Sequence, residues 1–385
     1  MASLMCPHCW NKTQEKELYR RCPQRCDSAN EDTEREWYPA GQKLCPHGRP
    51  ADGDRYHRCP KVDPDRDDLE PWEYRILEYD YITTKSRIVA MIGSSESGKS
   101  TFIGVLINEF RNRMGSVFPG MATDLVGDKS RDRYRRVFKV PMYEQGETVQ
   151  FTNTVRAAYR LDPLLVMVRR PKRVLFREGL SVAMLVFFDT AGEDVLKDEN
   201  IDNLINYLDA AEAIVVMIDP LQIRSVRRDL DDGIPIPKSV IDQVEIVQRL
   251  GELLRRKRRL NPTQKISTPI AVTVGKTDAL ASSLLAGSAI HRRGRHDGVY
   301  NEADGQEIND EMRAVLSAWD DGQALLNVVD TNFSDVRFFG VSALGVTPPS
   351  AGVISPLGIQ PHRVEDPLLW LLSRFGLVDV RKVKR

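Results

Sequence analysis

The stretch MIGSSESGKST, residues 91–101, contains the spacing G-x-x-x-x-G-K-S between two apolar segments. The segment before it, SRIVAMIG (86–93), is an apolar run of strand length, and the segment after it, STFIGVLINEF (100–110), has helical spacing. A glycine-rich turn between a strand and a helix is the context of a phosphate-binding P-loop. Backbone amides and the helix N-terminus would supply positive potential there, Lys99 would reach the β- and γ-phosphates, and the Ser100 hydroxyl would ligate Mg²⁺.

Length and charge exclude several classes of protein. The chain has 385 residues, enough for one large domain with extensions or for two domains. Its 55 Lys and Arg residues balance its 55 Asp and Glu residues, so no global field draws the chain to nucleic acid or to an anionic membrane. No apolar run approaches the roughly 18 residues needed to cross a bilayer, and the first residues are too polar for a secretory signal. We therefore expect a cytoplasmic protein.

Strand-like and helix-like segments alternate from about residue 74 onward, which predicts an α/β domain with a mostly parallel sheet flanked by helices. We expect strands at 86–93, 135–142, 181–189, 213–219, 269–275 and 336–342, and helices at 100–110, 200–211, 238–260, 307–326 and 366–376. The chain then divides into a small cysteine-rich module (1–60), an acidic linker (61–80) and the α/β domain (81–385), with insertions near 221–237 and 281–333, of which 221–237 and 287–305 are expected on the surface.

A second motif, LVFFDTAGE (185–193), ends a buried strand downstream of the P-loop. Asp189 is placed to hold Mg²⁺ through water, and the amide of Gly192 can contact a γ-phosphate and so sense its presence. The motif alone is common, but its position on a strand after a P-loop makes it a strong signal.

A third motif, AVTVGKTDAL (271–280), carries Lys276 and Asp278 in the spacing K-x-D. A carboxylate at Asp278 can accept hydrogen bonds from the ring N–H and the exocyclic amine that guanine has and adenine lacks, and the wrong base would leave that acceptor unpaired. The last expected strand leads into VSALG (341–345), where Ser342, Ala343 and Leu344 would meet the base from the other side through a backbone amide.

These elements, in this order and each at the carboxyl end of an expected strand, resemble a Ras-like P-loop GTPase of the translation-factor-related class over residues 81–385. The resemblance implies that GTP or GDP and Mg²⁺ are the cofactors and that the chain hydrolyses GTP to GDP and phosphate. It also implies that the phosphates contact Gly93, Ser94, Ser95, Glu96, Ser97, Gly98, Lys99, Ser100 and Thr101.

The chain departs from that family's pattern at two motif positions. Gly275 stands where the family has Asn or Thr, a side chain that helps to tie the base loop to the P-loop, so guanine binding is either weaker or supported by Thr273. Glu193 stands where many relatives have the Gln that orients the attacking water. Glu193 is either a base close to the γ-phosphate, which predicts slow hydrolysis without a partner, or a solvated loop residue.

Two further groups of a GTPase site carry a weaker signal. Thr123 in PGMATD (119–124) is our candidate for the switch threonine that meets Mg²⁺ and the γ-phosphate, the alternative being an ordinary loop threonine. An arginine finger could come from RRGR (292–295) or from a partner, although solvated loop arginines are the simpler interpretation.

All six cysteines lie in the first 59 residues. In a reducing compartment such thiols favour metal binding over disulfides. Tetrahedral Zn²⁺ would suit the four thiolates of Cys6, Cys9, Cys22 and Cys26, and a second site could use Cys45, His47, His57 and Cys59. Another partition, in which the second group completes the Cys6 and Cys9 pair, stays open. A closed zinc site does no chemistry, so the module is expected to dock protein partners, and nucleic acid is left open because its charges are of mixed sign.

A cysteine-rich module containing CPHCW, followed by a GTPase with GSSESGKST and FFDTAGE, resembles the second GTPase of bacterial double-GTPase conflict systems. The resemblance implies a GTP-dependent switch that assembles with partner proteins in defence against invasion. Two rival hypotheses remain, namely a GTP-holding scaffold with negligible hydrolysis and an ATP-dependent P-loop enzyme in which the K-T-D match is accidental.

Overall fold

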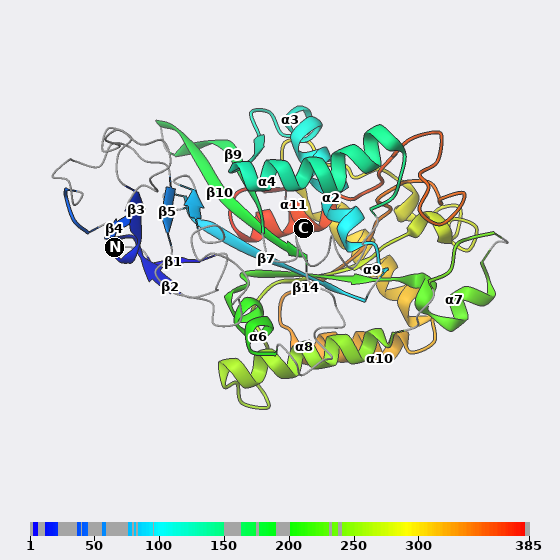
Figure 1. The fold of residues 1–385 in the computed structure, drawn as a ribbon. Coiled ribbons are helices and arrows are strands. Elements are labelled where there is room, and N and C mark those ends of the chain that lie inside the picture. The colour runs from blue at the N-terminus through cyan, green and yellow to red at the C-terminus, as the bar shows by residue number, and fades with distance from the viewer. Residues whose placement is uncertain are drawn as a thin grey trace.

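The computed structural model describes residues 3–6, 12–21, 37–39, 41–44, 56–58, 76–78, 81, 84–94, 96–149, 163–174, 177–189, 201–230, 233–237 and 241–381. Figure 1 shows a central twisted sheet between two groups of helices, with a small group of strands close to the N-terminus at one end. The expected α/β class is therefore confirmed.

The central sheet has seven strands in the described part of the chain. In spatial order they are β14 (Val336–Gly340), β12 (Ile270–Val274), β11 (Ala213–Ile218), β7 (Ser86–Gly93), β10 (Arg177–Asp189), β9 (Leu164–Val174) and β8 (Ala122–Leu125). Neighbours from β14 to β10 pair in parallel, whereas β9 is antiparallel to both β10 and β8. Because the five parallel strands point the same way, their carboxyl ends share one edge of the sheet, where ligands bind in open α/β folds.

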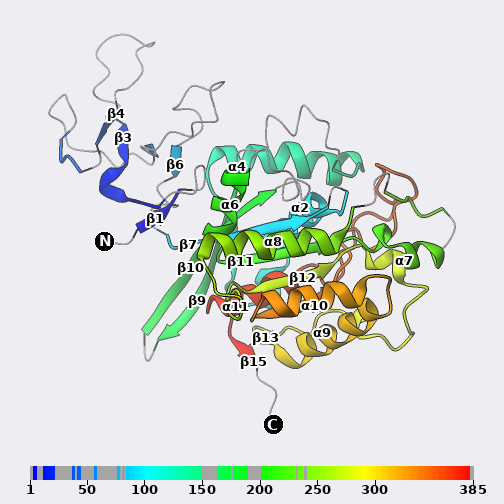
Figure 2. The same cartoon turned by 90° about the horizontal axis from the view of Figure 1, so that it is seen from below.

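Helices cover both faces of the sheet (Figures 1 and 2). One face carries α2 (Lys99–Asn112), α3 (Met114–Val117), α4 (Asp128–Arg133), η3 (Tyr134–Gln145) and α11 (Asp366–Arg374), and the other carries α6 (Ile201–Ala210), α8 (Gln243–Arg258), α9 (Glu302–Ser317) and α10 (Gly322–Asn332). Successive side chains of β7 alternate between the two cores, with Val89 and Met91 on the α2 side and Ile88 and Ala90 on the α8 side. Burial on both faces explains why this strand is apolar without interruption.

The strand expected at 135–142 is wrong, because these residues belong to the π-helix η3. Its buried side chains Tyr134, Val137, Phe138 and Met142 recur at helical spacing, so they face the same core. Phe138 packs against Gly104 of α2, where a Cβ atom would lie only 2.6 Å from the phenyl ring. Packing against α2 thus favours a helix here despite a short run of strand-like residues, and the local sequence pattern did not indicate this packing.

Two further expectations need correction. The helix expected at 307–326 is divided into α9 and α10, and the chain passes so close at Gly322 that a Cβ atom there would lie 1.7 Å from the carbonyl oxygen of Leu316. The segment near 281–333, of which 287–305 was expected on the surface, has buried side chains. It contains the buried Tyr300 and Asp304 as well as buried residues of both helices.

Short elements complete the described chain. They are β1 (Ser3–Met5), β2 (Lys12–Gln14), η1 (Glu15–Glu17), β3 (Tyr19–Arg21), β4 (Trp37–Pro39), β5 (Tyr56–Arg58), β6 (Ile76–Glu78), η5 (Pro220–Gln222), α7 (Arg224–Arg228), η6 (Thr277–Leu280), η7 (Ala289–His291), β13 (Tyr300–Asn301) and β15 (Val380–Arg381). The N-terminal strands form a two-stranded and a four-stranded sheet. They adjoin the main domain through Tyr81, whose hydroxyl donates to the carbonyl oxygen of Met5.

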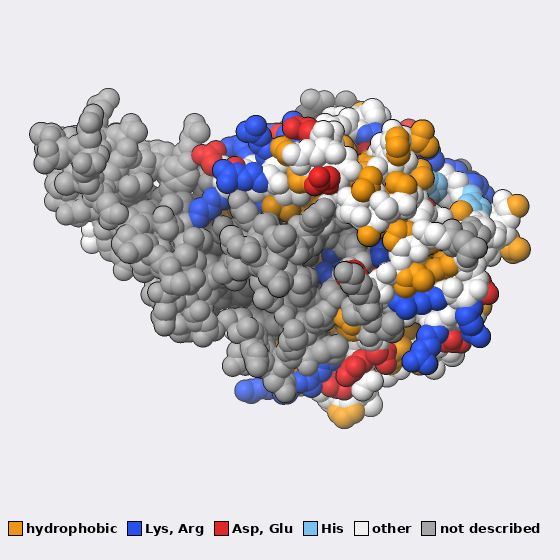
Figure 3. Space-filling model, turned by 45° about the vertical axis from the view of Figure 1, so that its right-hand side comes forward, with side chains coloured by type: hydrophobic (Ala, Val, Ile, Leu, Met, Phe, Trp, Pro, Cys, Tyr) orange, Lys and Arg blue, Asp and Glu red, His pale blue; other side chains and the backbone are white. Residues whose placement is uncertain are grey.

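The surface agrees with the balanced composition. In the view of Figure 3, acidic and basic side chains lie interspersed, without a continuous field of one sign. Among the residues that the structure describes, no helix combines the length and the apolar character that a membrane crossing requires.

Candidate functional site

The P-loop connects β7 to α2 at the carboxyl edge of the sheet. Gly93 ends the strand, and a Cβ atom there would lie 2.6 Å from the carbonyl oxygen of Met217, so only glycine fits between the neighbouring strands. Glu96 and Gly98 have φ values of 61° and 85°, which turn the backbone around the loop. The N-cap of α2 is Gly98, which has no side chain to cap the helix, and the start of this helix has the positive potential that attracts an anion.

Lys99 is nearly buried and folds back over this loop. Its Nζ donates to the carbonyl oxygens of Gly93 at 2.7 Å and Ser94 at 2.6 Å. The hydroxyl of Ser94 is buried without a hydrogen-bond partner among the described residues. A narrow glycine turn, a buried hydroxyl without a described partner and the start of a helix together fit a bound phosphate. Ser100, also buried, follows directly as the predicted Mg²⁺ ligand.

The base loop lies beside the P-loop. Lys276, in the left-handed backbone region at φ 52°, follows β12, and its Nζ donates to the carbonyl oxygen of Glu96 at 2.9 Å. Two residues later, the carboxylate of Asp278 accepts hydrogen bonds from Ser342 Oγ at 2.5 Å and from Thr347 Oγ1 at 3.0 Å. The structure thus brings the predicted phosphate loop, K-x-D loop and S-A-L loop together at one edge of the sheet.

Two functional candidates were missed by sequence reasoning. Thr347 lies just beyond the S-A-L stretch, and nothing in its sequence context distinguishes it from an ordinary loop threonine. Asp219 follows β11 directly and forms an ion pair with Lys276, with 2.8 Å between Nζ and Oδ2. Burial raises the pKa of Asp219, while the charge of Lys276 acts in the opposite direction. Its position at the carboxyl end of a buried strand was a signal that could have found it.

Thr273 does not take the place of the missing side chain at Gly275. Its hydroxyl is completely buried and donates to the carbonyl oxygen of Ala271 in its own strand, at 3.4 Å. The hydrogen bond made by this hydroxyl therefore stays within β12 and gives no support to the alternative in which Thr273 compensates for Gly275. The link between the base loop and the P-loop is made by Lys276 instead.

The strand register places Thr123 too far from the P-loop to bind an ion there. Thr123 pairs with Val168 on β9, which pairs with Ala183 on β10, and the next residue of β10 pairs with Ser86 at the start of β7. Thr123 therefore lies level with the amino end of β7, about 25 Å along the strand direction from Gly93. It belongs to the edge strand β8 rather than to a loop.

Part of the predicted site falls outside the residues that the structure describes. This applies to Ser95, Gly192 and Glu193. For Asp189 only the backbone is described, which ends β10 opposite Met91 of β7, one strand from the P-loop. Its role as a water-mediated Mg²⁺ ligand stays a prediction.

The predicted zinc ligands are mostly beyond the described part of the chain as well. Cys6 is buried and packs with the main core. His57 is described only as backbone within β5, and nothing is described for Cys9, Cys22, Cys26, Cys45, His47 and Cys59. Zinc binding therefore stays a prediction.

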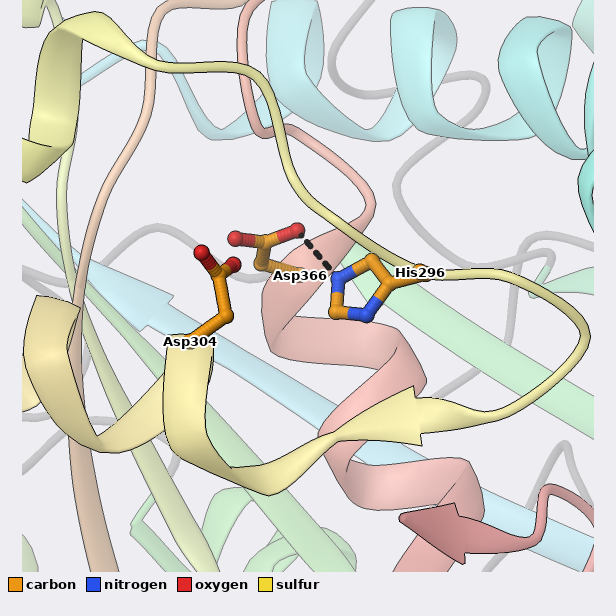
Figure 4. Close-up of side chains that lie close together, drawn as sticks. All are labelled: His296, Asp304 and Asp366. Carbon is orange, nitrogen blue, oxygen red and sulfur yellow. Dashed lines mark hydrogen bonds and ion pairs between the residues drawn. The ribbon is translucent and has the colours of Figure 1, made fainter. Parts of the chain in front are cut away.

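A second polar cluster, shown in Figure 4, is buried and consists of His296, Asp304 and Asp366. His296 Nε2 lies 2.9 Å from Asp366 Oδ1, and Asp304 lies beside them. These three side chains could surround a cation, but Arg363 pairs with both carboxylates and Arg295 pairs with Asp304. Because the guanidinium groups already balance the two carboxylates, we assign the cluster a structural role.

This cluster predicts a pH-dependent stability. Although burial acts to raise it, the pKa of Asp304 is lowered by Arg363 and Arg295. The contribution of Asp304 should therefore be present above about pH 4, the unfolded value, and be lost as pH falls through the lower folded pKa. Asp304→Asn should lower the free energy of unfolding by about 3 kcal/mol at pH 7, because it leaves buried Arg363 short of a partner.

The test is denaturant unfolding between pH 7 and 3. Asp297→Asn is the matched control, because the Asp297 side chain is 91% exposed. An Asp304→Asn variant with the stability and acid sensitivity of the wild type would show that this ion cluster does not stabilise the fold.

The family model Double-GTPase 2 matches residues 87–344. SaeC of Mycolicibacterium smegmatis, which is named for scaffolding and assembly of ESX-1, is 27% identical over 318 residues, covering 75% of this chain and 75% of SaeC.

Solved structures of GTPases are also similar. The GTP-bound GTPase-like domain of Saccharomyces cerevisiae Ski7 is 16% identical, with a TM-score of 0.32, and the match covers 78% of this chain and 51% of that one. Elongation factor SelB of Methanococcus maripaludis is 9% identical, with a TM-score of 0.26, and the match covers 78% of this chain and 36% of that one. The chain thus spans about half of the Ski7 chain and about a third of the SelB chain. Because the family model covers well over half of the sequence, from β7 to the loop after β14, the chain belongs to the Double-GTPase 2 family of P-loop GTPases.

Proposed function

We propose that this protein is a GTP-binding and GTP-hydrolysing molecular switch that acts with protein partners. The observation that carries the proposal is the contact of Lys276 with the P-loop carbonyl of Glu96, while Asp278, two residues further on, presents a carboxylate at the same edge. This contact supports the proposal because one guanine nucleotide would need the phosphate loop and the loop of the guanine-selecting carboxylate side by side.

The proposed reaction is attack of water on the γ-phosphoryl group, with GDP and phosphate as products. Lys99 would exchange its loop carbonyls for phosphate oxygens, and the amides at the start of α2 would stabilise the developing charge. Ser100 and Asp189 would hold Mg²⁺, which supplies charge neutralisation between the phosphates. The Gly192 amide would sense the γ-phosphate, and Glu193 would lie near the attacking water.

The proposed output is a conformational change that partner proteins recognise. The name of SaeC concerns scaffolding and assembly, and this supports assembly with partners more directly than the defence role that the motif resemblance implies. We keep both contexts as proposals, together with a zinc-bearing N-terminal module as the docking surface. The same name favours a second candidate, namely a GTP-dependent scaffold with negligible hydrolysis.

The first test is nucleotide competition. Purified protein is incubated with Mg²⁺ and equal concentrations of GTP and ATP, and the nucleotide that remains bound is quantified. Retained guanine nucleotide is expected. Preferential retention of ATP would overturn the assignment of Lys276 and Asp278 and favour an ATP-dependent enzyme.

Single-turnover hydrolysis separates the switch from the scaffold. We expect slow hydrolysis by the wild type and a further decrease of about tenfold or more in Glu193→Ala, because a positioned carboxylate contributes general-base catalysis. Glu144→Ala, at an exposed position of η3, is the matched control. Bound GTP that is not hydrolysed by the wild type, even with a cognate partner, would favour the scaffold.

A further inference from the structure

Lys276 connects three parts of the nucleotide edge. It belongs to the base loop, its Nζ donates to the P-loop carbonyl of Glu96 at 2.9 Å, and the same Nζ lies 2.8 Å from Asp219 Oδ2 at the end of β11. An ammonium group has three donors on a flexible stem, so its direction depends on the acceptors around it. Of the two acceptors described here, Asp219 is the charged one.

Asp219 is held more rigidly than Lys276. Its side chain is fully buried, whereas 28% of the Lys276 side chain is exposed. Its Oδ1 accepts a hydrogen bond from the amide of Leu221 at 3.0 Å. The side-chain amide of Gln243 clamps its backbone, because Oε1 accepts from the Asp219 N–H at 2.9 Å and Nε2 donates to the Asp219 carbonyl at 2.7 Å. The carboxylate therefore points in a fixed direction toward Lys276.

Gly275 has no side chain that could connect the base loop to the P-loop, so this connection depends on Lys276. A Cβ atom at Gly275 would lie 3.6 Å from the carbonyl oxygen of Ser97, so a polar side chain there would reach the P-loop directly. Glycine has no such side chain. The contact between Lys276 and Glu96 is a side-chain link between the two loops.

We propose that Asp219 is a positioning residue that holds Lys276 against the P-loop and thereby slows the release of guanine nucleotide. The inference rests on the proposed guanine nucleotide site. Asp219 touches neither base nor phosphate in this account, and it acts through Lys276 alone. An ion pair that only stabilised the fold would affect unfolding but would not be specifically coupled to nucleotide release.

The first experiment is a double-mutant cycle on the dissociation rate of fluorescent GDP, with Asp219→Asn, Lys276→Met and the double variant in the full chain. Asp219→Asn should raise the rate by about tenfold. In the Lys276→Met background, the same substitution should change it by less than about twofold. Asp242→Asn is the matched control, because Asp242 caps α8 and Asn caps equally well.

The second experiment restores the link by another route. Gly275→Asn is tolerable because Gly275 is outside the left-handed region and the nearest atom to its Cβ is the flexible Met217 Cε at 3.2 Å. In the Asp219→Asn background it should return the GDP dissociation rate to within about threefold of the wild-type rate. Gly275→Ala in the same background adds the Cβ without the amide and should restore nothing.

The outcomes separate this inference from the function on which it rests. If the wild type retains no guanine nucleotide, the proposed function fails. If it retains guanine nucleotide but Asp219→Asn leaves the dissociation rate unchanged, or the effects of Asp219→Asn and Lys276→Met multiply, only the positioning role fails. Should Asp219→Asn not fold, Asp219→Glu shifts the carboxylate by one methylene, and an unchanged dissociation rate in that variant would also overturn the role.

Discussion

Lys99→Ala is expected to reduce single-turnover GTP hydrolysis by about 100-fold or more, because preorganised positive charge at the transferred phosphoryl group contributes strongly to catalysis. Lys99 is buried, and hydrogen bonds to the carbonyl oxygens of Gly93 and Ser94 hold its Nζ against the P-loop. It needs only to change acceptors to reach a phosphate. GTP affinity should fall as well, because the alanine variant removes the lysine charge that would contact the phosphates.

The measurement is release of γ-phosphate from stoichiometric GTP, together with thermal unfolding to confirm that the variant is folded. Lys85→Ala is the matched control, since Lys85 is exposed just before β7 and lies at the opposite end of that strand. If the Lys99→Ala variant hydrolysed GTP at the wild-type rate, the phosphates would have to bind elsewhere. That result would contradict the proposed phosphate-binding site.

The parallel part of the fold could be predicted because its strands are buried on both faces. The expected strand at 86–93 agrees with β7 residue for residue, and those at 213–219 and 269–275 agree with β11 and β12 to within one or two residues. Such strands are continuous apolar runs, which a single sequence displays directly. The antiparallel strand β9 was not predicted from the sequence, because its C-terminal half is polar and strongly basic.

The candidate site could be predicted where the chemistry lies in a continuous motif. Lys99, Asp278 and Ser342 belong to such motifs, and the structure brings their loops together. Asp219 and Thr347 contribute through contacts between loops distant in sequence, which spacing cannot reveal. The prediction of Thr123 as a Mg²⁺ ligand was wrong because it depended on a wrongly predicted strand. Thr123 was chosen as lying just before a strand at 135–142, and that segment is helical.

Gly275 illustrates how a departure from a motif is understood only in three dimensions. The sequence suggested a weakened base loop or a substitute on the same strand. In the structure Lys276 donates a hydrogen bond to the P-loop carbonyl of Glu96 and also forms a salt bridge with Asp219, 57 positions away in the sequence. The cost of burying Asp219 is offset by this partner and by the hydrogen bond from Leu221.

Asp278→Asn is expected to weaken GTP binding by about 100-fold or more and to create affinity for xanthosine triphosphate. In the proposed site the carboxylate would accept hydrogen bonds from the N–H and the amine of guanine, whereas the amide of Asn would offer a donor to the 2-oxo group of xanthine. A buried polar site rejects a base that leaves its groups unpaired. The variant should keep its fold, because the hydroxyls of Ser342 and Thr347 can each donate or accept.

The measurement is equilibrium competition of GTP, xanthosine triphosphate and ATP for wild type and variant, with binding of xanthosine triphosphate to the wild type as the control. A change of preference from guanine to xanthine would show that the base contact itself is altered. General damage to the loop would instead weaken the binding of both nucleotides. Unchanged nucleotide preference in a folded Asp278→Asn protein would mean that the base does not meet this carboxylate. Lys276 would then be a structural partner of Asp219, and the P-loop would serve a nucleotide chosen by other residues.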